Sequence, residues 1–99
     1  MEQLAYKYPT KQPINKKIHV GVVGSGDLEI LMFPTEKKES TVKICTGSDG
    51  FGEVWNNVLT RFFDRYPISA DIVINDFGAT PGVVYLRLTQ ATEELSDEK

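Results

Sequence analysis

The chain has 99 residues, of which 40% are hydrophobic and 25% are charged, and its formal net charge is −3 at pH 7. This length and composition fit one small globular domain and exclude a disordered chain, so we expect a single domain over residues 1–99. The negative net charge argues against a nucleic-acid-binding protein, which would carry a basic patch or stripe.

The first segments predict a β-hairpin after a polar start. Residues 1–17 are polar and are expected to form a loose leader or an irregular edge segment. Two β-branched runs follow, His19–Val23 and Leu28–Phe33. The residues between them, 24–27, are typical of a turn, because glycine tolerates positive φ and aspartate bonds to nearby backbone groups. The pattern predicts two antiparallel strands joined by this turn.

The middle of the chain predicts a third strand and then a helix. Residues 41–46 alternate between apolar and polar side chains, which indicates a strand. From Phe51 to Tyr66 apolar residues recur at spacings of one, three and four, which indicates a helix of about four turns with one broad apolar face. Ser48 or Asp49 is expected to cap its start.

The last part of the chain predicts two more strands. Residues 71–75 form a short apolar run, residues 76–82 ("DFGATPG") read as a connection, and residues 83–89 alternate as a fifth strand would. The acidic residues 93–99 are expected to be a frayed tail. The order is three strands, one helix and two strands (βββαββ). We therefore expect an α+β, two-layer domain with one amphipathic helix on a mostly antiparallel sheet of about five strands.

The residues give little support for catalysis or for a metal site. His19 is the only histidine, and the length of a strand separates it from Ser25, so a Ser-His-Asp arrangement is not expected. The glycines touch the serine directly, unlike the Gly-x-Ser-x-Gly elbow of α/β-hydrolases. One histidine and one cysteine, Cys45, lack any metal-ligand spacing, and Cys45 is expected to be a buried structural thiol.

The sequence also predicts where the protein resides. No apolar run approaches the ~20 residues that cross a bilayer. The N-terminus lacks a basic segment followed by an apolar core, so no signal peptide is expected. We therefore expect a cytoplasmic protein without a membrane span.

One chemical role for Ser25 remains, which is to be modified by another enzyme. Gly24 and Gly26 have no β-carbons, so the active site of a modifying enzyme could approach the backbone around the Ser25 hydroxyl. Asp27 could orient that hydroxyl or favour the turn. The alternative is a plain hairpin turn, and the residues by themselves favour this alternative.

Two long segments, "VGVVGSGDLEIL" and "INDFGATPGVVYLRL", resemble the acyl carrier (delta) subunits of malonate decarboxylase. The resemblance extends from about Lys17 to Glu94. It implies that Ser25 is the attachment point of phosphoribosyl-dephospho-coenzyme A, bound covalently through a phosphodiester, with Gly24, Gly26 and Asp27 as its turn context. The chain would then be a non-catalytic carrier, with no catalytic and no metal-binding residues of its own.

The resemblance also implies partners. An acyl-carrier transferase subunit would exchange acetyl for malonyl on the cofactor's thiol, decarboxylase subunits would remove CO₂ to regenerate acetyl, and a holo-carrier synthase would attach the cofactor. Two alternatives stay open: a citrate-lyase-type carrier with the same cofactor, and an unmodified protein-binding module. The "DFGATPG" segment is either an ordinary connection or part of the surface beside the cofactor turn, and the sequence does not place it next to Ser25.

Overall fold

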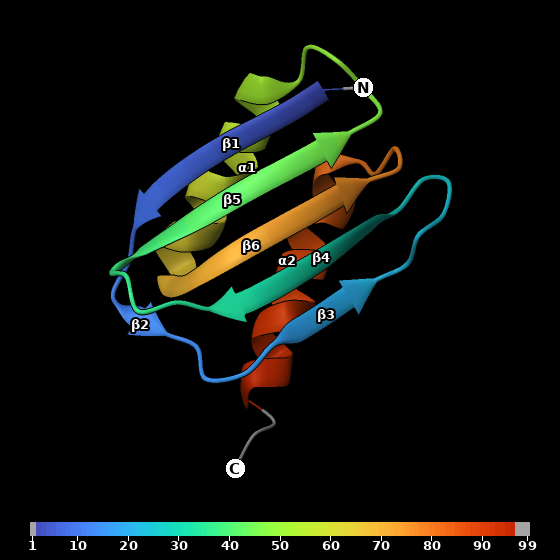
Figure 1. Cartoon of the computed structure of the whole chain (residues 1–99). Helices are drawn as coiled ribbons and strands as arrows, with labels where there is room; N and C mark the ends of the chain where they lie inside the picture. Colours follow the sequence, from blue (N-terminus) through green and yellow to red (C-terminus); the bar gives the residue numbers. More distant parts are fainter. Residues whose placement is uncertain (1, 97–99) are drawn as a thin grey trace.

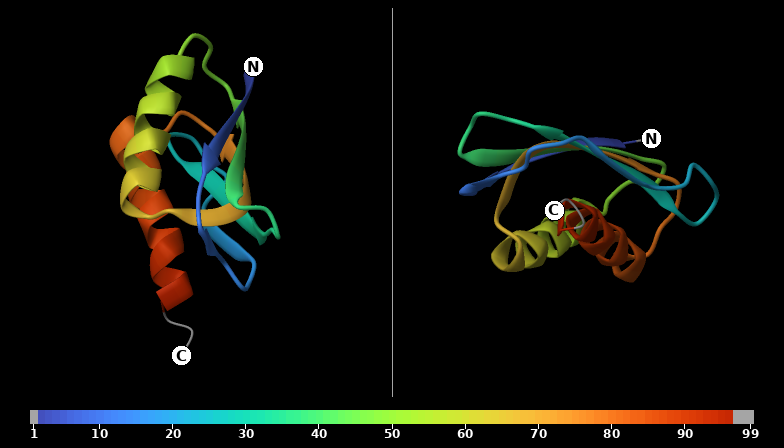
Figure 2. Two further views of the ribbon diagram at one scale, coloured as in Figure 1. Left: turned by 90° about the vertical axis from the view of Figure 1, so that its left-hand side faces the viewer. Right: turned by 90° about the horizontal axis from the view of Figure 1, so that it is seen from below.

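The computed structural model describes residues 2–96, in which two helices pack on one face of a six-stranded sheet (Figures 1 and 2). The strand order is β1-β5-β6-β4-β3, with a two-residue strand, β2, paired with β6 off this path. Neighbouring strands are antiparallel except for the β5–β6 and β2–β6 pairs. The predicted α+β, two-layer class is confirmed. The strands are β1 (Glu2–Pro9), β2 (Gln12–Pro13), β3 (Ile18–Gly21), β4 (Leu28–Pro34), β5 (Glu39–Thr46) and β6 (Ile68–Asp76), and the helices are α1 (Gly52–Arg65) and α2 (Pro81–Ser96).

Helix α1 agrees with its prediction in extent and in the face that it buries. Its sheet-facing side includes Leu59 and Phe62, both fully buried. Burial of side chains of this size stabilises the fold by ~1.5–3 kcal/mol each. The predicted caps are wrong, because Phe51 is the N-cap residue and no side chain caps the helix.

The first residues form a regular strand, so the expectation of a loose or irregular segment is wrong. β1 (Glu2–Pro9) pairs along its whole length with β5 at the edge of the sheet. Its inward side chains hold α1, because the Tyr6 hydroxyl donates to the Gly52 carbonyl (2.6 Å) and the Tyr8 hydroxyl donates to Asn56 Oδ1 (2.7 Å). The partners lie more than forty residues away, since these two bonds span 46 and 48 positions.

The predicted fifth strand over residues 83–89 is wrong, because these residues belong to helix α2. Pro81 occupies the first helical position, where its missing N–H costs nothing. The backbone N–H of Val83 donates to Thr80 Oγ1 (3.3 Å), which is the contact of an N-cap residue. Val84 and Leu88 are buried and lie four positions apart, so the helical period rather than the apparent alternation governs this segment.

Helix α2 also takes up part of the expected acidic tail. Residues 93–96 continue the helix, so the frayed tail predicted from residue 93 is wrong for them, and residues 97–99 lie outside the described residues. The expectation of one helix is corrected to two, and that of about five strands to six.

The strand directions bring three loops to one end of the sheet. β3 and β6 are both antiparallel to β4, and β5 is parallel to β6. The C-terminal ends of β3, β5 and β6 therefore lie at the same end of the sheet (Figure 1). The loops that follow them, residues 22–27, 47–51 and 77–80, therefore lie together. The candidate site lies among these three loops.

Candidate functional site

Ser25 lies exposed in the loop between β3 and β4, the strands of the predicted hairpin. The Asp27 N–H donates to the Gly24 carbonyl (3.2 Å) and closes the turn around the serine. Gly26 has φ +79°, a conformation that favours glycine. A β-carbon built on Gly24 or on Gly26 would meet no other atom within 4 Å, so the space on both sides of Ser25 is open.

The segment after β6 holds this loop through backbone hydrogen bonds. The Gly26 N–H donates to the Phe77 carbonyl (2.8 Å), and the Phe77 N–H donates to the Asp27 carbonyl (2.8 Å). The "DFGATPG" segment is thus in direct contact with the Ser25 loop. Its Gly- and Pro-rich composition marked it in the sequence, but its position depends on the pairing of β4 with β6.

A two-point ion pair ties the same loop to helix α2. The Arg87 guanidinium donates from Nε to Asp27 Oδ1 (3.1 Å) and from NH2 to Asp27 Oδ2 (2.7 Å), and the Leu28 N–H also donates to Oδ1 (2.7 Å). Hydrogen bonds from Arg87, and then from Leu28, hold the pKa of the Asp27 carboxyl below its ordinary value. Of the two roles considered for Asp27, the structure supports stabilisation of the turn. Arg87 was missed by the sequence analysis, since it lies on the segment predicted as a strand.

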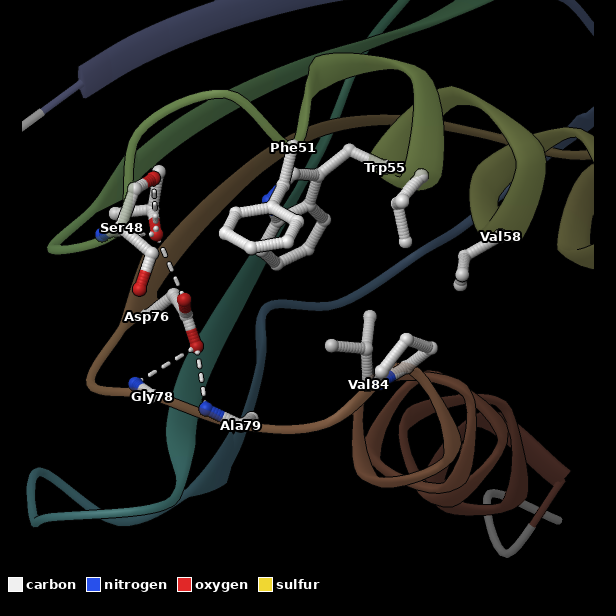
Figure 3. A pocket seen from close by; sticks show the side chains of 11 residues that line it. Ser48, Phe51, Trp55, Val58, Asp76, Gly78, Ala79 and Val84 are labelled. Carbon is white, nitrogen blue, oxygen red and sulfur yellow. Dashed lines mark hydrogen bonds between the residues drawn. The ribbon is translucent and has the colours of Figure 1, made fainter.

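Asp76 fixes the conformation of residues 77–80, the loop that contacts the Ser25 loop. Its side chain is buried, with Oδ2 accepting from the Thr46 hydroxyl (2.8 Å) and Oδ1 accepting from the N–H groups of Gly78 (3.2 Å) and Ala79 (2.9 Å) (Figure 3). A carboxylate that accepts backbone N–H groups in this way sets the path of a turn. The Phe77 carbonyl and N–H are thereby held where the Ser25 loop can pair with them.

A surface hollow of about 500 Å³ lies beside Ser25. It is lined by the Ser25 loop and by the two neighbouring loops, and Cys45 borders it from β5. Cys45 is half-buried and alternates along β5 with the buried side chains of Val42, Ile44 and Thr46, so it lies on the opposite face and the expectation of a buried thiol is wrong. The hollow leaves room for a group attached to the serine oxygen, with contact to solvent on its outer side.

The single histidine is engaged elsewhere on the hairpin. His19 Nε2 lies 2.9 Å from Glu29 Oε2, and Asn75 Nδ2 donates to Glu29 Oε1 (3.0 Å). The Asn75 amide, followed by His19, lowers the pKa of the Glu29 carboxyl. Glu29 thus links β3, β4 and β6 through side-chain contacts, and neither His19 nor Glu29 lines the hollow beside Ser25.

Within residues 2–96, no set of three or more His, Cys, Asp or Glu side chains is arranged to bind a metal ion. Over the same residues, neither helix has the length and apolar character needed to span a membrane.

Comparison with known proteins gives consistent matches over almost the whole chain. Residues 15–95 match the family model of the malonate decarboxylase delta subunit (MdcD). The chain is 43% identical to the malonate decarboxylase acyl carrier protein of Azotobacter vinelandii, over 98% of this chain and 99% of that relative. It is 42% identical to the protein of the same name from Pseudomonas syringae pv. tomato, over 99% of this chain and 100% of that relative.

A solved structure has the same fold. A chain in the crystal structure of a Pseudomonas malonate decarboxylase hetero-tetramer in complex with malonate superposes with a TM-score of 0.91. The sequence identity is 43%, and the match covers 96% of this chain and 99% of that chain.

Proposed function

This chain belongs to the family of malonate decarboxylase delta subunits, the acyl carrier proteins of that enzyme, and from this premise we propose that its Ser25 hydroxyl carries the prosthetic group. The group we propose is phosphoribosyl-dephospho-coenzyme A, joined to Ser25 Oγ through a phosphodiester. When bound, it supplies the thiol that forms the acyl thioester. The observation that carries the proposal is the exposed serine between two unobstructed glycines, at the mouth of a hollow large enough for a nucleotide-sized group.

The chain's own part is to present the oxygen and to hold its surroundings in place. On attachment, Ser25 Oγ forms a bond to the phosphorus of an activated donor, the bond from that phosphorus to the donor's phosphate leaving group breaks, and the hydroxyl proton passes to the attaching enzyme or to solvent. Two backbone hydrogen bonds tie the Ser25 loop to Phe77 in the loop after β6. The ion pair between Asp27 and Arg87 ties the same loop to helix α2. These contacts limit the number of positions from which the flexible arm starts, which is the positioning that a cofactor-bearing protein supplies.

The charges near Ser25 also suit a phosphodiester. The negative charge of Asp27, two residues away, is paired with the Arg87 guanidinium at 2.7 Å, which reduces its repulsion of a phosphate. Ser25 is exposed, so a phosphate on its oxygen stays hydrated and carries no large desolvation cost.

We further propose that this chain does no chemistry on the acyl group itself. An acyl-carrier transferase subunit exchanges acetyl for malonyl on the thiol, and decarboxylase subunits remove CO₂ and leave acetyl. A holo-carrier synthase attaches the prosthetic group. The hetero-tetramer containing the similar chain supports the idea of such an assembly. His19, the single histidine, does not line the hollow beside Ser25, which supports a serine that is modified by another enzyme.

Intact-mass measurement tests the proposal. The chain is produced together with the malonate decarboxylase subunits and their modifying enzymes from the same host. One adduct with the mass of phosphoribosyl-dephospho-coenzyme A is expected, with the modified peptide containing Ser25. The adduct is lost in Ser25→Ala and kept in Ser48→Ala, which changes an exposed serine in the neighbouring loop. An unmodified wild-type chain in an active complex would overturn the proposal.

The same preparation separates the two alternatives that the sequence left open. A citrate-lyase-type carrier would support turnover of citrate rather than malonate. An unmodified protein-binding module would leave malonate decarboxylation intact in Ser25→Ala.

A further inference from the structure

A second cavity, of about 320 Å³ and with aromatic side chains in its wall, lies between the beginnings of the two helices. Phe51 and Trp55 form its wall on the α1 side, and Val84 forms its wall on the α2 side (Figure 3). Pro81, the first residue of α2, also lines it. Its volume is at the lower end of the ~300–1,000 Å³ typical of small-molecule sites, and such sites combine apolar walls with a few polar groups.

This cavity adjoins the hollow beside Ser25. Four residues at the sheet edge line both spaces: Thr46, Ser48, Asp76 and Gly78. To reach the aromatic walls while covalently bound, a group attached to Ser25 passes over these four residues.

We propose that this cavity binds the purine ring of the prosthetic group, an inference that rests on the proposed function of Ser25. In phosphoribosyl-dephospho-coenzyme A the adenine hangs on the second sugar from the serine, whereas the thiol is at the far end of the pantetheine arm. Adenine is the planar, uncharged and aromatic part of the group. A ring of this kind gains from burial against Phe51 and Trp55, with the Ser48 hydroxyl at the mouth for its polar edge.

The acyl end fits this cavity poorly. Among residues 2–96, the only charged side chain that lines it is Asp76, and no lysine, arginine or histidine of that range does so. A malonyl carboxylate placed there would lose its hydration without gaining a cation and would face a second carboxylate. The lining therefore favours the base and leaves the pantetheine arm outside.

Binding of the base would shorten the mobile part of the cofactor. With the adenine held between α1 and α2, only the pantetheine arm would sweep through solvent toward the partner subunits. The volume searched by the thiol would fall, which raises its effective concentration at active sites within reach.

Trp55 is the only tryptophan in the chain and provides a direct signal for occupancy. The unmodified and modified full-length chains are compared by tryptophan fluorescence, by acrylamide quenching and by the NMR shift of the Trp55 indole N–H. Attachment is expected to shift the indole resonance and the fluorescence, whereas acrylamide quenching should stay low in both forms because Trp55 is only 6% exposed. A modified chain with an unchanged Trp55 signal would overturn the inference, while the mass adduct would leave the proposed function of Ser25 intact.

A matched pair of variants tests the wall itself. Phe51 is 50% exposed and Leu86 is 51% exposed, so replacing either one by alanine should leave the fold intact, but only Phe51 lines the cavity. Phe51→Ala should keep the mass adduct. It should lower the ratio of modified chains with the purine inside the cavity to those with it outside, as reported by Trp55, by about two- to twelvefold, equivalent to the ~0.5–1.5 kcal/mol of one aromatic pair. Leu86→Ala should leave the ratio unchanged. Equal effects of the two variants would overturn the inference.

Free nucleotides test the cavity without any attachment to Ser25. Adenosine 5′-monophosphate at millimolar concentration should perturb the Trp55 indole in the unmodified chain, and pantetheine should not. A response to pantetheine alone would overturn the assignment of the cavity to the base.

Discussion

Asp27 and Arg87, sixty positions apart in the sequence, form a two-point ion pair that joins the Ser25 loop to helix α2. The planar guanidinium donates from two nitrogens to the two carboxylate oxygens, a geometry that lysine does not reproduce. Arg87 NH1 also donates to Gln90 Oε1 (3.0 Å), which steadies the guanidinium on the helix. The proposed attachment loop is therefore held by a helix as well as by the sheet.

We expect Arg87→Gln to loosen the Ser25 loop without unfolding the domain. The side chain is partly exposed, and its main partner is Asp27, so the loss should be local. Hydrogen exchange of the Gly26 N–H, which donates to the Phe77 carbonyl, should become several-fold faster. Arg65→Gln, in the last turn of α1, removes the same charge away from the loop and is the control. Unchanged exchange at Gly26 would show that the backbone bonds alone hold the loop.

The same ion pair predicts a response to acid. The Arg87 guanidinium lowers the pKa of the folded-state Asp27 carboxyl below its ordinary value of 3.8. The unfolded chain therefore binds this proton first as pH falls, so the stabilisation is present above pH 3.8 and is lost as pH falls through the lower, folded-state pKa. NMR titration of the Asp27 carboxyl carbon should give a midpoint below 3.8, and Arg87→Gln should move it upward. A midpoint at the ordinary value in the wild type would contradict the ion pair in solution.

Asp76 should be important for stability because it accepts three hydrogen bonds at a buried position. Asp76→Ala would leave the Thr46 hydroxyl and two backbone N–H groups without this acceptor, and we expect the free energy of unfolding to fall by about 2–4 kcal/mol. Chemical denaturation measures the change. Asp76→Asn keeps one acceptor oxygen and should lose less, and Asp71→Ala, at an exposed position of the same strand, should have little effect. A loss equal to that of Asp71→Ala would contradict the role of Asp76.

The elements that the sequence predicted correctly are those with a strong local pattern. Helix α1 shows its apolar face over four turns, residues 41–46 alternate between apolar and polar side chains, and residues 71–75 form a short apolar run. Helix α2 was missed because Val83 and Val84 are β-branched and because Leu86 and Leu88 are followed by the polar residues Arg87 and Thr89, which looks like a strand's alternation. Thr80 followed by Pro81 was the available signal for a helix start.

The candidate site was predictable only in part, for a different reason. Ser25 and its glycines stand together in the sequence, so the turn could be recognised. Its supports come from elsewhere, since Phe77 and Arg87 reach the loop only through the pairing of β4 with β6 and the packing of α2. The aromatic cavity depends on the beginnings of two helices, one of which was not expected. Contacts between distant segments leave no local pattern to detect.

Gly24 and Gly26 flank the same serine, yet we expect replacement by alanine to lower the stability of the fold at Gly26 and to leave it almost unchanged at Gly24. Gly26 has φ +79°, so Gly26→Ala strains the backbone and should lower the free energy of unfolding by about 1–2 kcal/mol. Gly24 lies outside that region, and a β-carbon there meets no atom within 4 Å, so Gly24→Ala should change stability by less than ~0.5 kcal/mol.

The two variants should also differ in how readily Ser25 is modified. Nothing within the described chain requires glycine at position 24, so we infer that its missing side chain gives the modifying enzyme access to the Ser25 hydroxyl. Gly24→Ala should therefore slow the appearance of the mass adduct although the fold is as stable as the wild type. Time-resolved intact-mass measurement, with thermal denaturation of the same samples, separates the effects. Modification of Gly24→Ala at the wild-type rate would show that the enzyme does not need the space beside Gly24.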